Sequence, residues 1–172
     1  MLPDPFKNIT HFIFDVDGVL TDGMVLVLEN GLQARLMNTK DGYALQLAIK
    51  KGYRILIVSG ALASPVTDRL NKLGITEVHM AVTDKRTFVL NYIETNGLDN
   101  STILFMGDDM PDLPVMDIVG LATAPADAID EMKHAATYIS SKNGGKGCVR
   151  DVIERVLKAR GDWMVVPGIA SR

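Results

Sequence analysis

The strongest constraint on the fold is an alternation of short apolar runs with segments of helical spacing. The run His11–Phe14 ends at Asp15 and is typical of a strand that is buried on both faces of a parallel sheet. Further strands are expected at residues 54–58, 77–80, 102–106, 120–122 and 137–139, and helices at 41–51, 63–73, 84–96, 112–119, 127–134 and 147–160. This alternation predicts an α/β fold with a Rossmann-like, doubly wound, mainly parallel sheet that helices cover on both faces.

One segment near the start departs from that alternation. Asn30-Gly31 separates two extended runs, residues 23–29 and 32–38, and Asn-Gly between apolar runs is the strongest short-range signal for a hairpin. A β-hairpin insertion is therefore expected over about residues 23–38, directly after the first strand. Asp41 is expected to be the N-cap of the helix that follows the hairpin.

The composition is consistent with one domain over residues 1–172. The chain has 172 residues, of which 47% are hydrophobic, so a sizeable core can be buried. A net charge of -3 argues against a nucleic-acid-binding protein. No apolar run has the length of a signal peptide or a membrane span, and the single cysteine, Cys148, cannot form an intramolecular disulfide. These features predict a cytoplasmic protein in which Cys148 is a small buried residue at the start of a helix.

The last part of the chain, residues 161–172, has no clear helical or strand pattern. It carries Trp163, Met164, Val165 and Val166. A frayed terminus is one interpretation. Because the tail is so apolar, we expect it to dock on its own subunit or on a neighbouring one.

Aspartates gather directly after two of the expected strands. Asp15 and Asp17 follow the first strand, and Asp108, Asp109 and Asp112 follow the strand that ends at Met106. The carboxyl ends of parallel strands meet at one edge of the sheet, where such proteins bind ligands. Clustered carboxylates repel one another, so a hard cation such as Mg²⁺ is expected among them. Helix capping is an adequate alternative for Asp109 or Asp112 alone, but not for two clusters that each follow a buried strand.

Two further positions suit phosphate. Ser59-Gly60 follows the strand at residues 54–58, where a hydroxyl and free backbone N–H groups can bind phosphate oxygens. The alternative is an N-cap with a glycine turn. Lys85 stands in the first turn of a helix, where a cation opposes the helix dipole unless it faces phosphate or carboxylates. Taken alone, Lys85 would be interpreted as an exposed lysine.

Together these residues resemble the motifs of the haloacid-dehalogenase-like phosphohydrolases. The run from Phe14 to Thr21 (FDVDGVLT) is similar to the first motif of that family. The second, third and fourth motifs correspond to Ser59, to Lys85 and to the run from Gly107 to Asp112 (GDDMPD). The order and spacing agree over about residues 10–120.

The resemblance implies a Mg²⁺-dependent phosphatase that forms an aspartyl-phosphate. Asp15 would be the nucleophile, and Asp17 would protonate the leaving oxygen and then activate water. The metal would be held by Asp15, Asp108 and the backbone carbonyl of Asp17. The remaining roles are shared: Mg²⁺, Ser59, Gly60 and Lys85 would stabilise the phosphoryl group, while Asp109 and Asp112 would orient waters and Lys85.

The lengths between motifs point to a branch without a cap domain. Thr21 to Ser59 and Lys85 to Gly107 leave room only for the hairpin and for single helices and strands. The segments at 38–43 (NTKDGY) and 144–151 (GGKGCVRD) resemble the 3-deoxy-D-manno-octulosonate 8-phosphate (KDO 8-phosphate) phosphatases. That resemblance covers nearly the whole chain. It implies hydrolysis of KDO 8-phosphate in lipopolysaccharide biosynthesis, by a homotetramer in which neighbouring subunits complete each site.

One departure from that family leaves the substrate open. Ala61 stands where many of these phosphatases have an arginine available to the carboxylate of the sugar. Lys40, Lys146 and Arg150 are candidate replacements, with exposed lysines and a solvated helix face as the alternatives. A nine-carbon keto-sugar acid 9-phosphate is therefore a second candidate substrate. An inactive oligomerisation module of this fold is a third interpretation, but it is disfavoured because every motif residue is retained.

Overall fold

The computed structural model describes residues 4–62 and 65–169 and contains a parallel sheet. The sheet has six strands in the order β5-β4-β1-β6-β7-β8, and every pairing in it is parallel. The strands are β1 (His11–Phe14), β4 (Arg54–Val58), β5 (Glu77–His79), β6 (Ile103–Met106), β7 (Leu121–Ala124) and β8 (Tyr138–Ile139). The predicted doubly wound fold class is therefore confirmed.

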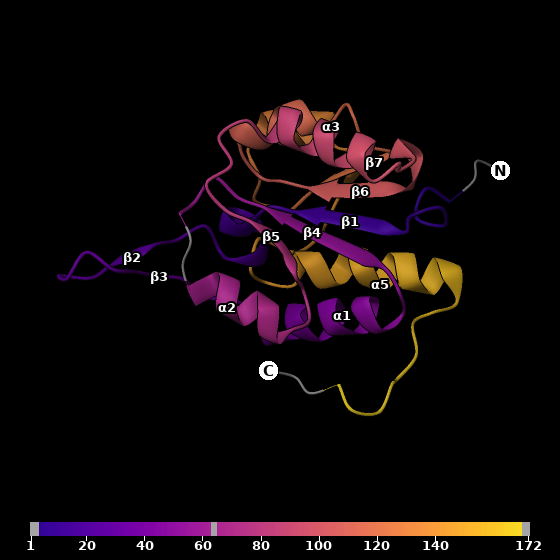
Figure 1. Cartoon of the computed structure of the whole chain (residues 1–172), viewed down its shortest axis with the longest axis horizontal. Coiled ribbons are helices and arrows are strands. Elements are labelled where there is room, and N and C mark those ends of the chain that lie inside the picture. Colours follow the sequence, from indigo (N-terminus) through magenta and orange to yellow (C-terminus); the bar gives the residue numbers. More distant parts are fainter. Residues whose placement is uncertain (1–3, 63–64, 170–172) are drawn as a thin grey trace.

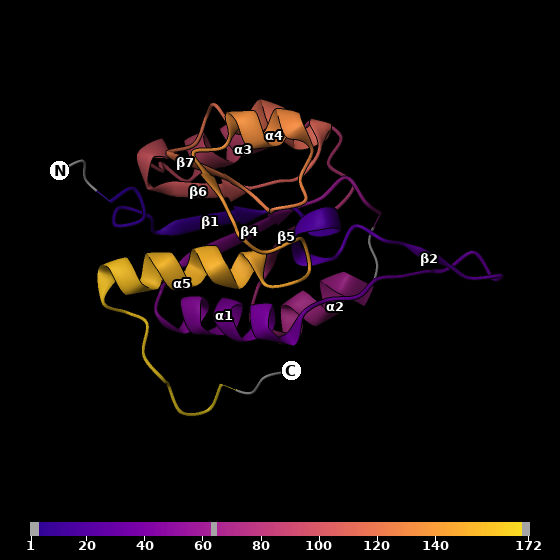
Figure 2. The same cartoon turned by 180° about the vertical axis from the view of Figure 1, so that it is seen from behind.

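Helices cover both faces of this sheet (Figures 1 and 2). One face carries α1 (Thr39–Lys50), α2 (Pro65–Lys72) and α5 (Cys148–Arg160). The other carries α3 (Lys85–Thr95), α4 (Asp130–Ala135) and the 3₁₀ segment η3 (Met110–Val115). Each face of the sheet has its own hydrophobic core, and strand β1 contributes side chains to both. Phe12 and Phe14 pack on the first face and Ile13 packs on the second. Complete burial of each such side chain contributes about 1.5–3 kcal/mol.

The register of the central strands decides which loops meet. Phe14 is aligned with Ile57 on β4 and with Met106 on β6. The residues that follow these three strands therefore emerge at the same edge of the sheet. The backbone N–H of Asp15 donates to the carbonyl of Met106 at 3.1 Å and continues that alignment beyond the strand.

The predicted hairpin is present, but its ladder is short. Strands β2 (Leu26–Val27) and β3 (Gln33–Ala34) pair antiparallel, and Gly31 has a φ of 79° in the turn between them. The hairpin projects from the body of the molecule (Figure 1). Its apolar side chains are open to solvent, as shown by the exposed fractions of 73% for Met24 and 71% for Leu36.

The prediction that Asp41 is the N-cap of α1 is wrong. The cap is Asn38, whose side-chain oxygen accepts a hydrogen bond from the Lys40 N–H at 2.8 Å. Asp41 lies within the first turn, and its Oδ1 accepts from the N–H of Arg150 at 2.7 Å. Asp41 therefore caps α5, a helix that lies beside α1, rather than its own helix.

The helix expected at residues 112–119 is also different. Chain 110–115 forms the 3₁₀ segment η3, and Asp109 is its cap. Pro111 and Pro114 lie within it and remove backbone donors, which prevents a regular α-helix. For the helix expected at 63–73, residues 63–64 lie outside the described part of the chain, and α2 begins at Pro65. The remaining predicted helices and strands are present with ends shifted by a few residues.

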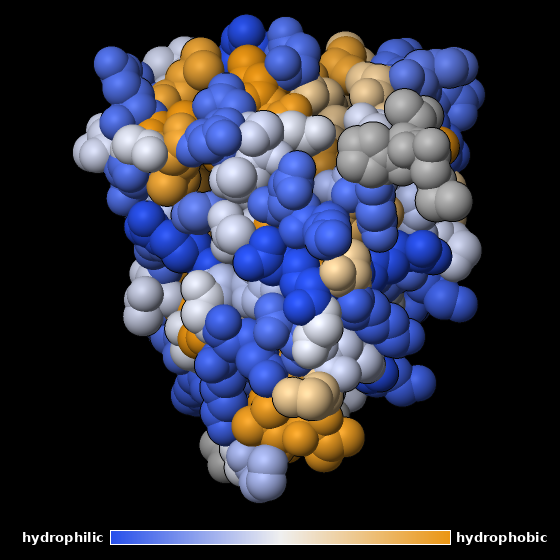
Figure 3. Space-filling model, turned by 90° about the vertical axis from the view of Figure 1, so that its right-hand side faces the viewer, coloured by the Kyte–Doolittle hydropathy of each residue, from blue (hydrophilic) through white to orange (hydrophobic). Residues whose placement is uncertain are grey.

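The tail packs on its own chain as far as it is described. The rings of Trp163 and Tyr43 meet edge to face with centroids 6.4 Å apart, and the Arg150 guanidinium lies 5.4 Å from the Trp163 ring centroid. The Tyr53 hydroxyl donates to Asp162 at 2.7 Å. Figure 3 shows a hydrophobic cluster at the lower edge of the molecule, where the tail passes in Figure 1. Among the described helices, none combines the length and apolar character needed to cross a bilayer.

Candidate active site

A pocket of about 260 Å³ opens at the carboxyl edge of the central strands. It is formed by the loops after β1, β4 and β6 and by the start of α3. The residues that line it are Asp15, Asp17, Gly23, Ser59, Gly60, Ala61, Lys85, Asp108, Asp109, Pro111 and Asp112. The structure therefore brings together every residue of the motifs that were predicted to carry the chemistry.

The loop after β1 approaches the loop after β6 unusually closely. Gly18 has a φ of 84°, a conformation that favours glycine. A Cβ atom at this position would overlap the carboxylate of Asp108. The glycine of the first motif is thus required by the contact between the two acidic loops as well as by the backbone turn.

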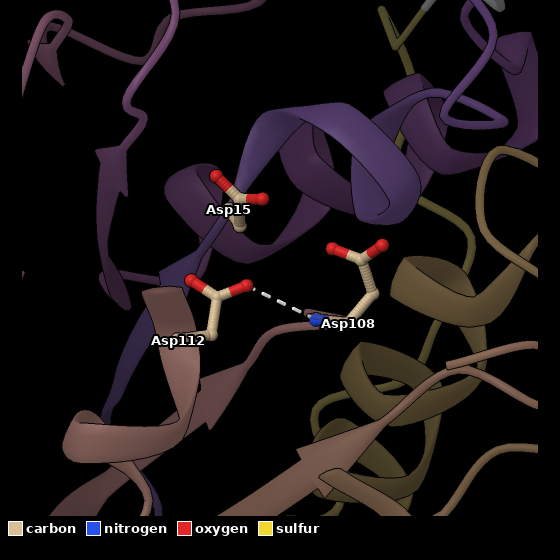
Figure 4. Close-up of side chains that lie close together, drawn as sticks. All are labelled: Asp15, Asp108 and Asp112. Atoms are coloured by element: carbon tan, nitrogen blue, oxygen red, sulfur yellow. Dashed lines mark hydrogen bonds between the residues drawn. The ribbon is translucent and has the colours of Figure 1, made fainter. Parts of the chain in front are cut away.

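Three carboxylates form the floor of the pocket. Asp15, Asp108 and Asp112 each offer an oxygen atom, and these atoms lie within 4.8 Å of one another (Figure 4). The Oδ2 atom of Asp112 accepts a hydrogen bond from the backbone N–H of Asp108 at 3.1 Å. Lys85 is 5% exposed, and its Nζ lies 2.8 Å from Asp15 and 2.6 Å from Asp112. Sequence reasoning placed Lys85 facing the carboxylates, and it does so.

This cluster carries more negative charge than one lysine can balance. Burial, followed by the charge of Asp112, raises the pKa of Asp15 to about 7 against the opposing effect of Lys85. Burial, followed by the charge of Asp15, raises the pKa of Asp108 to about 7. Burial lowers the pKa of Lys85, but Asp15 and Asp112 outweigh that effect and raise it overall. The pocket therefore favours an additional positive charge.

The donors fit a divalent cation. Among the described residues, Oδ1 of Asp108 is buried without a hydrogen-bond partner, which is costly for a carboxylate oxygen unless a cation contacts it. Both oxygens of Asp112 are already engaged, by Lys85 and by the Asp108 N–H. Asp15 and Asp108 are thus the side chains best able to contact a metal, and oxygen ligands of this kind suit Mg²⁺.

Asp17 lies at the side of the pocket, apart from the three-carboxylate cluster. Its carboxylate is paired with Arg35, whose Nε lies 2.6 Å from Oδ1 and whose Nη2 lies 3.1 Å from Oδ2. Sequence reasoning missed Arg35. A signal was available, because Arg35 is the only basic residue in the hairpin range 23–38. A lone basic residue in a largely apolar hairpin suggests an acidic partner nearby.

The second-motif residues line the same pocket as the carboxylates. Ser59 is buried, its N–H donates to the carbonyl of His79 at 2.9 Å, and its hydroxyl accepts from the Ala61 N–H at 3.1 Å. Gly60 and Ala61 also line the pocket. The Asp109 side chain is exposed at the mouth of the pocket, where it accepts from the Met110 N–H at 2.8 Å.

The three cations expected to recognise the substrate do not line the pocket. Lys40 is exposed in the first turn of α1. Lys146 is 60% exposed and lies 3.5 Å from Asp22. Arg150 pairs with Glu154 on its own helix and lies over Trp163 of the tail.

The glycine-rich loop before α5 supports the first motif from behind. The Gly145 N–H donates to the carbonyl of Val19 at 2.9 Å, and a Cβ atom at Gly144 would overlap the Gly18 carbonyl. The Cys148 thiol also donates to Val19, at 3.3 Å, and burial raises the pKa of this thiol. Cys148 is therefore a packed residue at a helix start, as predicted, and is not a nucleophile.

Comparison with known proteins agrees with this site. Residues 73–153 match the haloacid dehalogenase-like hydrolase family. The chain is 36% identical over 155 residues to the 3-deoxy-D-manno-octulosonate 8-phosphate phosphatase KdsC of Escherichia coli K12, covering 90% of this chain and 82% of that protein. Among solved structures, the phosphatase of the same name from Yersinia pestis has a TM-score of 0.88 at 34% identity, with 92% of this chain and 85% of that chain covered.

A second solved structure contains ligands. It is the 3-deoxy-D-manno-octulosonate 8-phosphate phosphatase of Moraxella catarrhalis in complex with magnesium ion, phosphate ion and KDO. Its TM-score is 0.89 at 30% identity, and the match covers 92% of this chain and 91% of that chain.

Proposed function

Because the chain belongs to the KDO 8-phosphate phosphatase family of the haloacid dehalogenase-like hydrolases, we propose that it hydrolyses KDO 8-phosphate to KDO and phosphate. The three relatives described above match over most of the chain and carry that name. The observation that carries the proposal is the position of Asp15, at the bottom of the pocket and beside Lys85.

The first chemical step is assigned to Asp15. One of its carboxylate oxygens attacks phosphorus, the bond from phosphorus to the sugar oxygen breaks, and an aspartyl-phosphate forms. The departing sugar oxygen takes a proton from Asp17. Lys85 holds Asp15 in place and offers positive charge to the phosphoryl oxygens.

The second step returns the enzyme to its starting state. The Asp17 carboxylate takes a proton from a water molecule, whose oxygen attacks phosphorus of the aspartyl-phosphate. The bond from phosphorus to Asp15 breaks, and phosphate leaves. The Ser59 hydroxyl and the backbone N–H of Gly60 would bind the phosphoryl oxygens, since both residues line the pocket.

The enzyme uses Mg²⁺, which Asp15, Asp108 and the backbone carbonyl of Asp17 would hold. The buried, unpaired Oδ1 of Asp108 supports this assignment. When bound, the metal supplies positive charge that offsets the carboxylates and the phosphate oxygens. Asp112 would keep Lys85 oriented, and Asp109 would orient water at the mouth of the pocket.

The substrate is tested by measuring phosphate release with Mg²⁺ from a panel of sugar phosphates. The panel holds KDO 8-phosphate, a nine-carbon keto-sugar acid 9-phosphate and simple hexose phosphates. A strong preference for KDO 8-phosphate, seen as the highest kcat/KM, is expected. A preference for the nine-carbon acid would favour the second candidate, which Ala61 at the pocket wall keeps open. Absence of activity on every ester would contradict the assignment as a phosphatase.

We also propose that the protein is a single-domain, cytoplasmic homotetramer whose neighbouring subunits complete each site. The exposed apolar hairpin supports the assembly, as does an apolar groove of about 520 Å³ beside it, lined in part by Leu28, Leu32 and Leu36. Lys40, Lys146 and Arg150 would then contribute to a neighbour's substrate site rather than to their own. Light scattering tests the mass, and a monomer would contradict the tetramer. One buried, unpaired cysteine suits a reducing cytoplasm.

A further inference from the structure

The ion pair between Asp17 and Arg35 joins the hairpin to the pocket. Arg35 directly follows β3, and the Asp17 side chain lines the pocket. The Arg35 side chain is 8% exposed and that of Asp17 is 33% exposed. Little solvent therefore reaches the guanidinium, although it belongs to a projecting segment of the chain.

The geometry of the contact fixes the direction of the carboxylate. Nε and Nη2 of Arg35 each donate to a different oxygen of Asp17, so the guanidinium and carboxylate planes are held edge to edge. A lysine could not do this, because its ammonium group is a point charge. Nη2 also donates to Gln33 at 3.4 Å, which ties the guanidinium to its own strand.

The base of the hairpin is itself anchored close to the first motif. Thr21 and Met37 form an antiparallel bridge, so the two ends of the hairpin are held together beside the pocket. The Thr21 hydroxyl donates to the Val16 carbonyl at 3.3 Å and lies 3.5 Å from Oδ1 of Asp17. The bridge between Thr21 and Met37 thus holds the end of the hairpin that carries Arg35 close to the loop that carries Asp17, in addition to the ion pair between their side chains.

We propose that Arg35 is a positioning residue that orients Asp17 for proton transfer. Because Arg35 belongs to the hairpin, proton transfer then depends on where the hairpin lies. This inference rests on the proposed function, in which Asp17 is the acid and base. The shorter contact, from Nε to Oδ1, holds the carboxylate throughout. The longer contact, from Nη2 to Oδ2, opens so that Oδ2 can exchange its proton with the sugar oxygen in the first step and with water in the second.

The test compares two substrates that differ in their need for an acid. KDO 8-phosphate is an alkyl phosphate, and its leaving oxygen must be protonated. p-Nitrophenyl phosphate releases a stabilised phenolate and does not need the acid. In Arg35→Met, kcat/KM for the alkyl phosphate should fall roughly 100-fold, the order of loss that misplacement of a catalytic group causes. For the aryl phosphate, kcat/KM should change little, because it reports only the steps through formation of the aspartyl-phosphate; kcat is not the readout, since Asp17 also activates water in the second step. Arg35→Lys should recover only part of the loss.

Two controls match the variant. Arg54→Met removes an arginine that pairs with Glu77 at the opposite end of the strands. In this variant the ratio of kcat/KM for the alkyl phosphate to kcat/KM for the aryl phosphate should equal that of the wild type. Asp17→Asn should shift the ratio in the same direction as Arg35→Met, and further. An equal loss of kcat/KM on both substrates, a loss for the alkyl phosphate that comes from KM alone, a change in oligomeric mass that accounts for the loss, or no change would each overturn the proposal for Arg35.

Failure of the proposed function gives a different pattern. If the wild type prefers another alkyl phosphate, the comparison is made with that ester and the role of Arg35 is still tested. If Asp17→Asn keeps full turnover of the alkyl phosphate, the proposed acid is wrong whatever Arg35 does. The two failures can therefore be told apart.

Discussion

Nζ of Lys85 lies 2.8 Å from Oδ1 of Asp15, although the helix that carries Lys85 follows β5, two strands away from β1 in the sheet. Both side chains are buried. The contact restrains the side chain of the nucleophile, so little of its rotational freedom remains to be lost before attack. It also explains why a cation in the first turn of α3 is retained despite the helix dipole.

Replacing the nucleophile should abolish turnover without unfolding the protein. Asp15→Asn keeps the shape of the side chain but cannot form an aspartyl-phosphate, so kcat should fall by at least about a thousandfold. Phosphate release measures the loss, and circular dichroism verifies the fold. A purified variant that retains a sizeable share of wild-type turnover would contradict the covalent mechanism.

Removing the charge of Asp108 should weaken Mg²⁺ binding at least about 100-fold, because an amide replaces the buried, unpaired carboxylate oxygen. Titration calorimetry of Asp108→Asn measures the affinity. Asp109→Asn is the matched control, since it removes the same charge from the next residue, which is exposed. Equal affinity in the Asp108 variant and the wild type would exclude Asp108 from contact with the metal.

The metal-free protein should become less stable as the pH rises from about 4 to about 8. Burial raises the pKa of Asp15 and Asp108 from 3.8 to about 7 and that of Asp41 to about 6. Between the unfolded and folded values the native state binds more protons, so the free energy of unfolding falls as the pH increases. Two of the described groups oppose this trend. Burial lowers the pKa of His11 from 6.5. Burial acts to raise the pKa of Glu154, but the hydrogen bonds from Lys158 and Arg150 outweigh it and lower that pKa from 4.5. Of the two, only His11 acts in the upper part of the range.

Melting temperatures in EDTA, compared with those in excess Mg²⁺, measure the trend. The metal should remove most of the dependence, because it binds the carboxylates in their charged form. Asp108→Asn should reduce the slope in EDTA. A melting temperature in EDTA that rises steadily over this range would contradict the assigned directions.

Asp41 should matter for stability and little for the chemistry. Asp41→Ala removes the acceptor for the Arg150 N–H at the start of α5, and the loss of such a cap should cost about 1–2 kcal/mol. Asp41→Asn keeps an acceptor oxygen and removes a buried charge, so it should be close to neutral. Urea denaturation measures both variants. If Asp41→Ala is as stable as the wild type, the capping role is wrong.

The sequence was most informative where local pattern and chemistry agree. The apolar run before Asp15 and the run before Gly107 predicted two adjacent parallel strands, and the register that follows brings their aspartates together. Lys85 could be placed because a cation in a first helical turn conflicts with the helix dipole. Residues that are unfavourable for their local structure indicate a functional site when several of them are expected at the same edge of the sheet.

The errors arose where a contact joins distant parts of the chain. Asn38 and Asp41 are both good capping residues, and only the packing of α1 against α5 assigns Asp41 to the second helix. Arg35 lies on the returning side of the hairpin, and no local pattern specifies that the hairpin directs it toward Asp17. The 3₁₀ form of η3 could have been predicted from Pro111 and Pro114.

The glycine-rich loop behind the first motif has a consequence for synthesis on the ribosome. Gly144 and Gly145 support the turn that carries Asp17 and Gly18, yet they are translated long after it. A nascent chain that has emerged through Asp112 holds all the acidic residues of the pocket but lacks the loop that backs them. The loop can therefore take its place behind the first motif only when the segment leading into α5 has left the exit tunnel.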